Sequence, residues 1–376
     1  MGLNVYPTPS NVTTRSYGFA ATGNGTATVN MPSGVYSYVA DNKAGNIALG
    51  ETVVSTSTGT MYLSSAITSA VITSISKATT WVTRTFTTAT TDVTIQALGY
   101  GNGIYIAGGN NGAIYTSSDA ETTGIWTTRT SEDAPNFTGN FVYGNGIYAV
   151  AQANSGTNTV HTSTDAITWT SRNPTLGSVS CIGVVFGNGI FMACANPGEK
   201  VATSTNGTTW TSRTAVGNVT TNTLSFAGGL FWIGMGNGVV RNSTDGVTWT
   251  TRSMAIGVGN VRGFAYGNGV YVGIENDIVQ SSTNGTSWTS RLNTGNSMSK
   301  VTFGDGVFVV SSNSNIQTST DAITWTSIPS TSSFGNTALT FGNGIFIGDA
   351  GSNSILRTAS HRKNFVFTNA DSTSVV

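Results

Sequence analysis

The residues of this chain that could do chemistry are few, and its carboxylates come first. Hydrolysis of a glycosidic bond needs two carboxyl groups about 5–10 Å apart. The five glutamates are Glu51, Glu121, Glu132, Glu199 and Glu275. Three of them, Glu121, Glu132 and Glu199, fall in segments that we expect to be solvated surface loops. Glu275-Asn276-Asp277 is the densest polar cluster with carboxylates, and we interpret it as a hairpin turn.

The histidines and cysteines give no catalytic or metal-binding pattern. The histidines are His161 and His361, and no Gly-x-Ser-x-Gly sequence accompanies them to indicate a Ser-His-Asp triad. We expect His161 to lie on a strand and face solvent. Cys181 and Cys194 flank one turn, so a cross-strand disulfide and two small core residues with free thiols are both open. Metal-ligand spacings, phosphate loops and dinucleotide fingerprints are missing, and we expect no catalytic residue, metal or cofactor.

The composition excludes several classes of protein. Charged residues make up 9% of the chain and the formal net charge is zero, whereas about 25% is typical of soluble proteins. A basic track for a nucleic-acid backbone is therefore not expected. No apolar run approaches the ~20 residues of a membrane-spanning helix, and Met1–Pro7 does not resemble a signal peptide. The polarity comes from Thr, Ser, Asn and Gly, which suit strands and tight turns.

The strongest feature is a repeated turn, which we call the Gly-Asn-Gly turn. It consists of an aromatic residue, Gly-Asn-Gly, an apolar residue and a second aromatic residue. Asn-Gly or Asp-Gly between apolar runs predicts a type I′ hairpin, in which both central residues need φ > 0. The aromatic residues can then pair across the two strands. The five full copies are Tyr100–Tyr105, Tyr143–Tyr148, Phe186–Phe191, Tyr266–Tyr271 and Phe341–Phe346, and two variants complete the set of seven: Phe226–Phe231 with Ala-Gly-Gly and Phe303–Phe308 with Gly-Asp-Gly.

A second turn, which we call the Ser-Asp turn, follows each of the first six Gly-Asn-Gly turns. It reads Ser-Thr-Asp/Asn-Gly/Ala-x-Thr/Ser-Trp, and Thr-x-Arg often follows. The Asp or Asn side chain can accept hydrogen bonds from backbone N–H groups of its own turn, and the Trp opens the next strand with a large apolar surface. We assign these residues a structural role. They are Asp119, Asp165, Asn206, Asp245, Asn284 and Asp321, with Trp126, Trp169, Trp210, Trp249, Trp288 and Trp325, and Trp81 in an earlier related segment.

One repeat therefore contains four strands in about 40 residues, which is the size of a propeller blade. We predict an all-β chain: a seven-bladed β-propeller preceded by a small N-terminal β-domain. Residues 1–70 lack both turns and contain alternating segments such as Val35–Val39, which are typical of a β-sandwich or a sheet, after an extended arm. The propeller spans 71–376. Within it, residues 71–84 either close the ring by completing the last blade or form a half-blade that leads into it.

The Ser-Asp turn resembles the Asp-box, or BNR repeat, of sialidases and other propellers, over about 290 residues. In that family the box lies on the outer rim and does not carry activity. A sialidase would also need an arginine triad, a Tyr–Glu pair and an Asp acid. Six of the 11 arginines occupy one repeat position after Trp, which indicates a structural role. The other five fit no triad motif, and they are Arg15, Arg241, Arg262, Arg357 and Arg362.

The chain also resembles decoration and fibre proteins of bacteriophage particles. This likeness implies a non-enzymatic structural or adhesive component of the virion, which is assembled in the host cytoplasm. Residues 1–70 would attach it to other virion proteins, and the propeller would face outward to bind a host-surface glycan. Neither nucleic-acid binding nor membrane insertion is expected, and homo-oligomerisation is open. The alternatives are a glycoside hydrolase or lyase that acts on a polysaccharide, and a bacterial surface adhesin.

Overall fold

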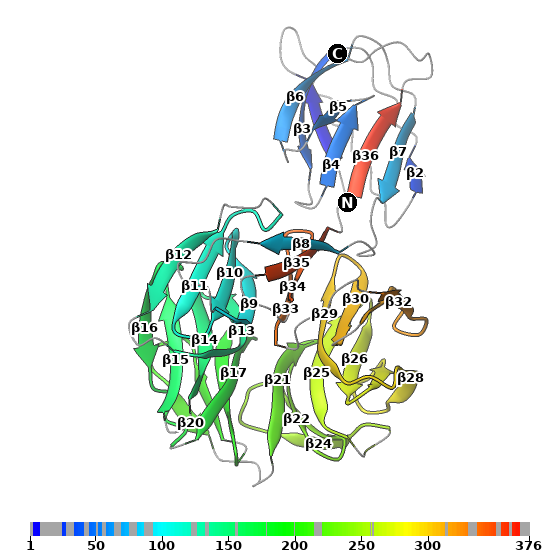
Figure 1. Ribbon diagram of the computed structural model, residues 1–376. Helices are drawn as coiled ribbons and strands as arrows, with labels where there is room; N and C mark the ends of the chain where they lie inside the picture. The colour runs from blue at the N-terminus through cyan, green and yellow to red at the C-terminus, as the bar shows by residue number, and fades with distance from the viewer. Residues whose placement is uncertain are drawn as a thin grey trace. The chain divides into compact units, whose positions relative to one another are not determined.

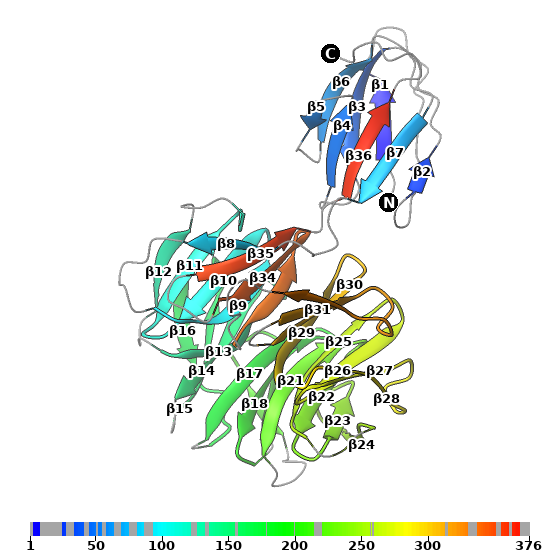
Figure 2. The same cartoon turned by 45° about the vertical axis from the view of Figure 1, so that its right-hand side comes forward.

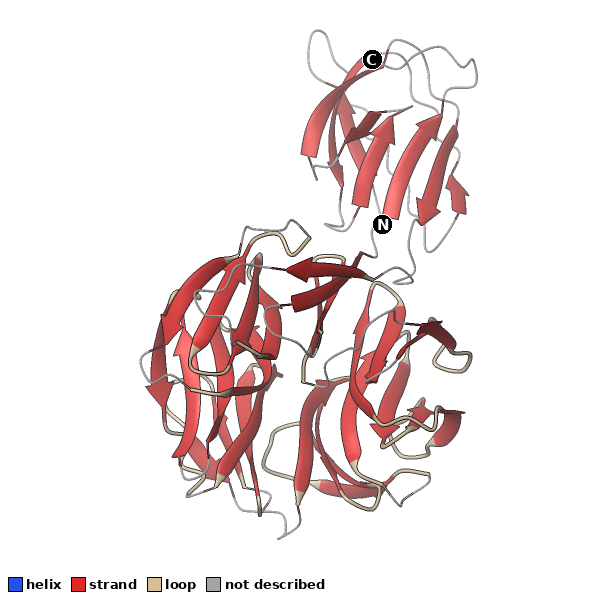
Figure 3. Cartoon of the chain, in the orientation of Figure 1, coloured by secondary structure: helices blue, strands red, loops and turns tan. Residues whose placement is uncertain are grey.

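The structure is a computed structural model of the 376-residue chain. It describes the strands within residues 3–74 and most of 81–368. The undescribed residues are 1–2, 8–24, 28–33, 41–44, 50–51, 55–57, 64–68, 75–80, 86–92, 122–125, 132–134, 155–156, 178, 199, 214–219, 256, 258, 313–314, 330–336, 351–354, 361–362 and 369–376. Every regular element among the described residues is a strand (Figure 3). Among them, no helix is long and apolar enough to cross a membrane.

The predicted propeller is present, and its seven blades are four-stranded sheets arranged around a centre (Figure 1). From the innermost strand outward, the first blade consists of β9 (Ile95–Gly101), β10 (Ile104–Gly109), β11 (Ala113–Ser117) and β12 (Thr127–Ser131). The second consists of β13 (Phe137–Gly144), β14 (Ile147–Asn154), β15 (Thr157–Ser163) and β16 (Thr168–Arg172). The third consists of β17 (Ser180–Gly187), β18 (Ile190–Asn196), β19 (Val201–Ser204) and β20 (Thr211–Arg213).

The next three blades are β21 (Thr221–Ala227), β22 (Leu230–Met235), β23 (Val239–Ser243) and β24 (Thr250–Ser253); β25 (Val261–Gly267), β26 (Val270–Glu275), β27 (Ile278–Ser282) and β28 (Thr289–Asn293); β29 (Met298–Gly304), β30 (Val307–Ser312), β31 (Asn315–Ser319) and β32 (Thr326–Pro329). The first two blades are also joined at their outermost strands, because β12 pairs in parallel with β16.

The last blade takes its outermost strand from the other end of the propeller sequence. Its strands are β33 (Leu339–Gly342), β34 (Ile345–Asp349), β35 (Ile355–Ser360) and β8 (Val82–Thr85). β8 is antiparallel to β35, and Arg84 Nε donates to Thr358 Oγ1 at 3.2 Å. This pairing joins two segments from opposite ends of the propeller sequence and closes the ring. Of the two roles left open for residues 71–84, ring closure describes residues 82–85.

The remaining strands form a second unit, and the chain divides differently from the predicted boundary at residue 70. One unit consists of Met1–Thr80, Asn343–Ile345 and Ser360–Val376, and the other of Trp81–Gly342 and Phe346–Ala359. The first contains a three-stranded sheet of β1 (Leu3–Pro7), β3 (Gly34–Ala40) and β6 (Thr58–Leu63). Its five-stranded sheet is formed by β2 (Gly25–Ala27), β7 (Ser69–Ser74), β36 (Lys363–Thr368), β4 (Gly45–Leu49) and β5 (Thr52–Val54).

Two segments assigned to the propeller by sequence therefore lie in this other unit. β36 is inserted between β7 and β4, antiparallel to the first and parallel to the second (Figure 2). The predicted blade half over residues 71–84 is thus divided, because Ser69–Ser74 pairs with β36 while Val82–Thr85 pairs with β35. Each segment has a short apolar run, Ala70–Ile72 in β7 and Phe365–Phe367 in β36, and such a run fits any buried strand and does not identify the partner strand.

The Gly-Asn-Gly turns have the backbone that their sequence predicts. Asn102, Asn145, Asn188, Asn268 and Asn343 have φ between 46° and 50°, and the glycine after each also has a positive φ. These two positive values are what a type I′ hairpin requires. The aromatic residues pair across each hairpin, as Tyr100 and Tyr105 do with ring centroids 4.6 Å apart. The second aromatic of each turn is buried, while the first keeps part of its surface exposed.

The same turns also hold neighbouring blades together. In six of the seven blades the innermost strand ends in a glycine that lies directly against the first aromatic residue of the next blade, as Gly187 does against Phe226, whereas β21 ends in Ala227. The asparagine side chain reaches the same neighbour: Asn188 Nδ2 donates to Gly229 O and Thr244 O, both at 2.9 Å. At the closure, Tyr105 Oη donates to Gly342 O at 2.8 Å. One short motif therefore forms a hairpin and also connects it to the next blade.

Candidate binding site in the central channel

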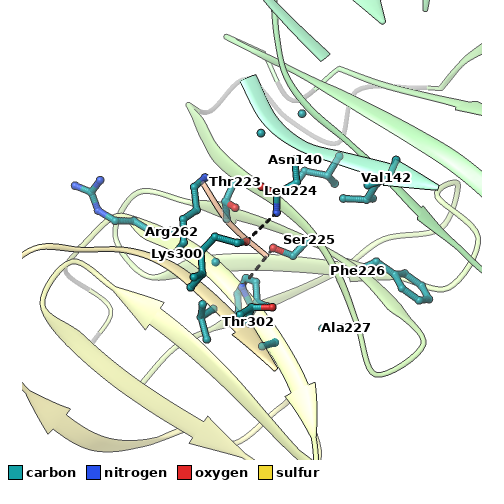
Figure 4. A pocket seen from close by; sticks show the side chains of 18 of the residues that line it. Asn140, Val142, Thr223, Leu224, Ser225, Phe226, Ala227, Arg262, Lys300 and Thr302 are labelled. Atoms are coloured by element: carbon teal, nitrogen blue, oxygen red, sulfur yellow. Dashed lines mark hydrogen bonds between the residues drawn. The ribbon is translucent and has the colours of Figure 1, made fainter. Parts of the chain in front are cut away.

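The innermost strands surround a cavity of about 400 Å³ in the centre of the propeller (Figure 4). Its lining comes from β13, β17, β21, β25 and β29, with Leu339 from β33. Figure 4 shows Asn140, Thr223, Arg262 and Lys300 around this space, on strands of four different blades. Side chains that are far apart in the sequence thus face one partly open cavity, which is the usual setting for a ligand.

A β-bulge places several of these side chains. In β9, β17, β21, β25 and β29 the pairing with the next strand shifts by one residue near the start of the innermost strand. The residue left unpaired lies four positions before the first aromatic of the Gly-Asn-Gly turn. A bulge leaves one residue outside the ladder and re-aims its side chain. The five unpaired residues are Gln96, Ile182, Asn222, Arg262 and Ser299.

A smaller and strongly polar cavity lies where these strands begin, and we call it the channel mouth. It measures about 230 Å³ and is lined by Asn222, Asn260, Arg262, Ser297, Ser299 and Lys300. Arg262 and Lys300 line the large cavity as well. Among the described residues that line the two cavities, these two are cations and none is a carboxylate. The channel mouth therefore combines positive charge with neutral amide and hydroxyl groups.

The two cations of the channel mouth are only partly compensated. Arg262 Nε is buried, and no described group accepts a hydrogen bond from it. Burial lowers the pKa of Lys300; the Asp349 carboxyl opposes this change and Arg262 adds to it. The Asp349 side chain is itself buried, which raises its pKa. The Asp349 carboxylate accepts hydrogen bonds from Ala338 N at 3.0 Å and from Thr337 Oγ1 at 2.9 Å, so both of its oxygens already have hydrogen-bond donors next to the seventh blade.

The neutral groups of the channel retain much of their hydrogen-bonding capacity. Asn222 Nδ2 donates to Asn260 Oδ1 at 3.3 Å, which uses one of the two N–H donors of Asn222. Asn140 Nδ2 donates to Leu339 O at 3.4 Å, from the second blade to the seventh, and Asn140 Oδ1 is buried without a partner among the described residues. Ser225 Oγ accepts from Phe264 N at 3.3 Å (Figure 4). A polar ligand can thus meet both donors and acceptors.

The carboxylate cluster picked out by sequence lies at a hairpin turn, as we interpreted it. Glu275 ends β26, Asn276 has φ 50°, and β27 begins at Ile278. The Glu275 side chain is 1% exposed; its Oε1 accepts from Gly259 N at 2.6 Å and its Oε2 from Gln280 Nε2 at 2.7 Å. One carboxylate oxygen therefore holds the loop before β25, and the other binds a side chain of β27. Glu121 donates its backbone N–H to Asp119 Oδ1, whereas Glu51, Glu132 and Glu199 lie outside the described residues.

The expected exposure of His161 is wrong. The side chain is fully buried, with Nε2 2.9 Å from Gln152 Oε1 and the ring packed edge-on against Phe137. Its position on β15 faces the first blade, and Ser131 Oγ lies 3.4 Å from Nδ1. A polar residue with a buried partner cannot be told from an exposed one by strand alternation alone. The second histidine, His361, lies outside the described residues.

The two cysteines are free thiols in the core. Cys181 lies on β17 and Cys194 on β18, and both are buried. In the ladder Cys181 faces Ala195 while Cys194 faces Gly183, because the bulge of this blade lies between them. Burial raises the pKa of Cys181 to about 12. A buried thiol that is protonated at neutral pH is a poor nucleophile. Of the two states left open by the sequence, the structure has the free thiols.

The acidic or amide residue of each Ser-Asp turn lies where its own backbone can bind it. Asp165, Asn206, Asp245, Asn284 and Asp321 each accept through Oδ1 from the N–H groups two and three residues later, at 2.8–3.0 Å. These bonds lower the pKa of Asp165, Asp245 and Asp321. Asp119 accepts from Glu121 N at 2.8 Å. Ala166 and Ala322, which replace glycine in this turn, take φ 59°.

The tryptophans of the repeat lie at the outermost strands. Trp169 is 1% exposed, Trp126, Trp210 and Trp288 are 8% exposed, and Trp81, Trp249 and Trp325 are half-buried. Trp210 Nε1 donates to Gly207 O at 3.0 Å. In five of the six copies the repeated arginine donates to a hydroxyl of the neighbouring strand, as Arg213 Nε does to Thr203 Oγ1 at 2.8 Å, whereas Arg252 Nε has no partner among the described residues. These residues lie outside the lining of the channel and brace the blades.

Sequence reasoning left Arg262 unassigned and did not consider Lys300. A signal was available in the repeat itself. When the blades are aligned on the first aromatic residue, the position four before it reads Gln96, Gly139, Ile182, Asn222, Arg262, Ser299 and Thr337. Residues that serve the fold are similar in every blade, whereas residues that face a ligand can differ from one blade to the next. Five of these seven residues line one of the two cavities, so the variable position was a signal for Arg262, whereas Lys300 lies one position later in its blade.

Comparisons with known proteins support the fold and nothing finer. No family model matches the chain, and no curated protein matches its sequence. A catalytically inactive virginiamycin B lyase from Staphylococcus aureus, crystallised with quinupristin, is similar in structure, with a TM-score of 0.65 and 10% identity over 75% of this chain and 99% of that one.

Two further propellers have the same fold. YCF48 from Cyanidioschyzon merolae has a TM-score of 0.57 at 12% identity over 74% of this chain and 98% of that one. The WD40 propeller domain of Doa1 has a TM-score of 0.57 at 10% identity over 76% and 96%. At such identities the likeness extends to architecture alone. The chain is an all-β protein with a seven-bladed propeller.

Proposed function

We propose that this protein is a non-enzymatic adhesive component of a virus particle, and that its propeller binds a glycan in the central channel. The observation that carries the binding role is the lining of the channel: amides, hydroxyls and two cations from neighbouring blades face one cavity. Sugars are recognised by such convergent donors and acceptors in a preformed concave site.

The described titratable groups of the propeller favour binding over catalysis. Glu275 and Asp349 accept hydrogen bonds from backbone N–H groups, and His161 is buried on Gln152. A glycosidase would need two carboxyl groups on either side of a bond in one cleft. Among the described residues, no group of three His, Cys, Asp or Glu side chains could hold a metal ion. The alternative of a polysaccharide-acting hydrolase or lyase gains no specific support.

The virion role rests on the sequence. The Thr-, Ser-, Asn- and Gly-rich composition and the low charge resemble outer proteins of bacteriophage particles, and the Ser-Asp turns resemble the Asp-box. In this proposal the unit of Met1–Thr80 and Ser360–Val376 attaches to other virion proteins, and the propeller is displayed outward. The division of the chain into two units agrees with separate anchoring and binding parts.

Binding is tested with the purified full-length protein on an array of bacterial surface polysaccharides. We expect retention on at least one polysaccharide, with no shortening of the bound chains over hours as followed by size-exclusion chromatography. Retention that is unaffected by Asn222→Ala together with Asn140→Ala would place the ligand outside the channel. Release of oligosaccharides would overturn the non-enzymatic assignment.

The virion role is tested on particles purified from cells that express the gene. Mass spectrometry should find the protein in the particle fraction after density-gradient centrifugation, at a constant ratio to the major capsid protein. A version that lacks residues 1–80 and 360–376 should leave the particle fraction. Absence of the full-length protein from purified particles would overturn the assignment and leave the binding role to be decided by the polysaccharide array.

A further inference from the structure

The channel mouth contains two like charges on neighbouring blades. Arg262 lies on β25 and Lys300 on β29, and both line the same cavity of about 230 Å³. Two cations that share a partly desolvated site disfavour each other, and an anion between them relieves both. The Asp349 carboxyl, on which Lys300 depends for partial compensation, is already bound to Thr337 and Ala338.

The chemistry of the Arg262 side chain suits a planar anion. Its Nε is buried and has no described hydrogen-bond acceptor, although the channel lining is polar. A guanidinium presents its N–H donors as a fixed fork that matches the two oxygens of a carboxylate. Lys300, on the adjacent strand, adds a point charge with three donors. Arg262 and Lys300 thus offer N–H donors to the same cavity.

The remaining lining suits the hydroxyl groups of a sugar. Asn222, Asn260, Ser297 and Ser299 surround the two cations with neutral donors and acceptors. The bond between Asn222 Nδ2 and Asn260 Oδ1 is 3.3 Å long, close to the upper limit for such a bond. A small inorganic anion would contact the two cations but not these four neutral residues.

We propose that the channel mouth binds the carboxylate of an acidic saccharide, with Arg262 and Lys300 on the carboxylate and the four neutral residues on the sugar hydroxyls. This inference rests on the glycan-binding role proposed above and names the class of glycan. Because both cations are partly exposed, the affinity falls as the salt concentration rises.

The probe is an array of uronic acid, sialic acid and pyruvylated oligosaccharides, each paired with its methyl ester. Esterification removes the charge and leaves the hydroxyl groups in place. We expect the full-length protein to bind at least one acid and to bind its ester about tenfold more weakly or worse. Arg262→Gln and Lys300→Met should each cause a loss of about the same size. Arg241→Gln, an arginine of β23 outside the channel lining, should have no effect.

Thermal unfolding separates a binding role from a structural one. Because Arg262 Nε has no described acceptor, Arg262→Gln should leave the melting temperature unchanged or raise it. A variant that lost binding and also melted well below the parent protein would contradict the assigned role.

Competing outcomes are distinguishable. Equal binding of inorganic phosphate or sulfate, displaced by no saccharide, would mean an adventitious ion only and would overturn the proposal. Binding of neutral glycans or esters that Arg262→Gln does not alter would overturn the acidic site and keep the glycan-binding role. Failure of every member of both arrays would overturn the two proposals together. Binding of carboxyl-terminal peptides in preference to the acidic sugars would replace the ligand class.

Discussion

A single methyl group placed between two blades should weaken the propeller. Gly187 ends the innermost strand of the third blade, and a Cβ at this position would overlap the Phe226 ring of the fourth blade. The Phe226 ring also packs against its own cross-strand partner Phe231, so the added methyl group has to displace a packed ring. Overpacking of this kind costs about 1–3 kcal/mol.

The same strand offers a matched control. Gly183 also lies on β17, neither glycine has a positive φ, and a Cβ at Gly183 would meet nothing within 4 Å. Replacement of glycine by alanine stabilises a compatible site by about 0.4–1 kcal/mol, chiefly by restricting the unfolded chain. This gain applies to both variants. The difference in the free energy of unfolding between Gly187→Ala and Gly183→Ala therefore isolates the steric effect, and we expect about 1–3 kcal/mol.

Urea unfolding followed by tryptophan fluorescence measures this difference in the free energy of unfolding for the propeller itself. All eight tryptophans of the chain lie between residues 81 and 325, within the propeller. The double variant Gly187→Ala with Phe226→Leu should recover part of the loss, because the two changes are coupled through one contact. Equal stabilities for Gly187→Ala and Gly183→Ala would refute the packing of each strand end against the next blade.

Three further predictions concern the turns of the propeller. Asn188→Gly keeps the positive φ but removes two bonds to the next blade, so it should cost about 1–2 kcal/mol in urea unfolding, and Asn188→Ala should cost more. The pKa values of Asp165, Asp245 and Asp321 are lowered by folding, so their stabilising effect is present above the unfolded pKa of about 3.9 and is lost as the pH falls through the folded values. The triple Asp→Asn variant should therefore show a flatter acid limb in a series of melting curves, as two blades already carry asparagine; an unchanged acid limb would contradict this. Glu275→Ala should lower the free energy of unfolding by about 2–3 kcal/mol with ligand binding retained, because the Glu275 carboxylate holds the loop before β25. If this variant instead kept full stability and lost the turnover of a polysaccharide, Glu275 would be a catalytic residue.

The propeller could be read from the sequence because each blade repeats its local chemistry. Asn188-Gly189 needs two positive φ values wherever it occurs between apolar runs, and Asp165 needs only the N–H groups of its own turn. Such features depend on residues a few positions apart. The count of blades followed from the count of these turns, since each turn fixes one hairpin.

The destinations of individual strands could not be read in the same way. The predicted blade half at residues 71–84 is divided between β7 and β8. The segment of β36, which was expected in the propeller, pairs instead with β7 and β4. A short apolar run favours a buried strand but does not specify which strand it pairs with. His161 shows the same limit at one residue, because its burial depends on Gln152 and on the neighbouring blade.

By itself, the sequence determined the hairpins, the Ser-Asp turns and hence the ring of blades, because these depend on backbone conformation and contacts within about ten residues. Only the tertiary structure decided which side chains meet in the channel. Arg262 and Lys300 are 38 positions apart by their numbers, and they share a cavity because a bulge in one strand and the curvature of the ring bring adjacent blades together. A repeat describes what the blades have in common, whereas a binding site is made of the positions at which they differ.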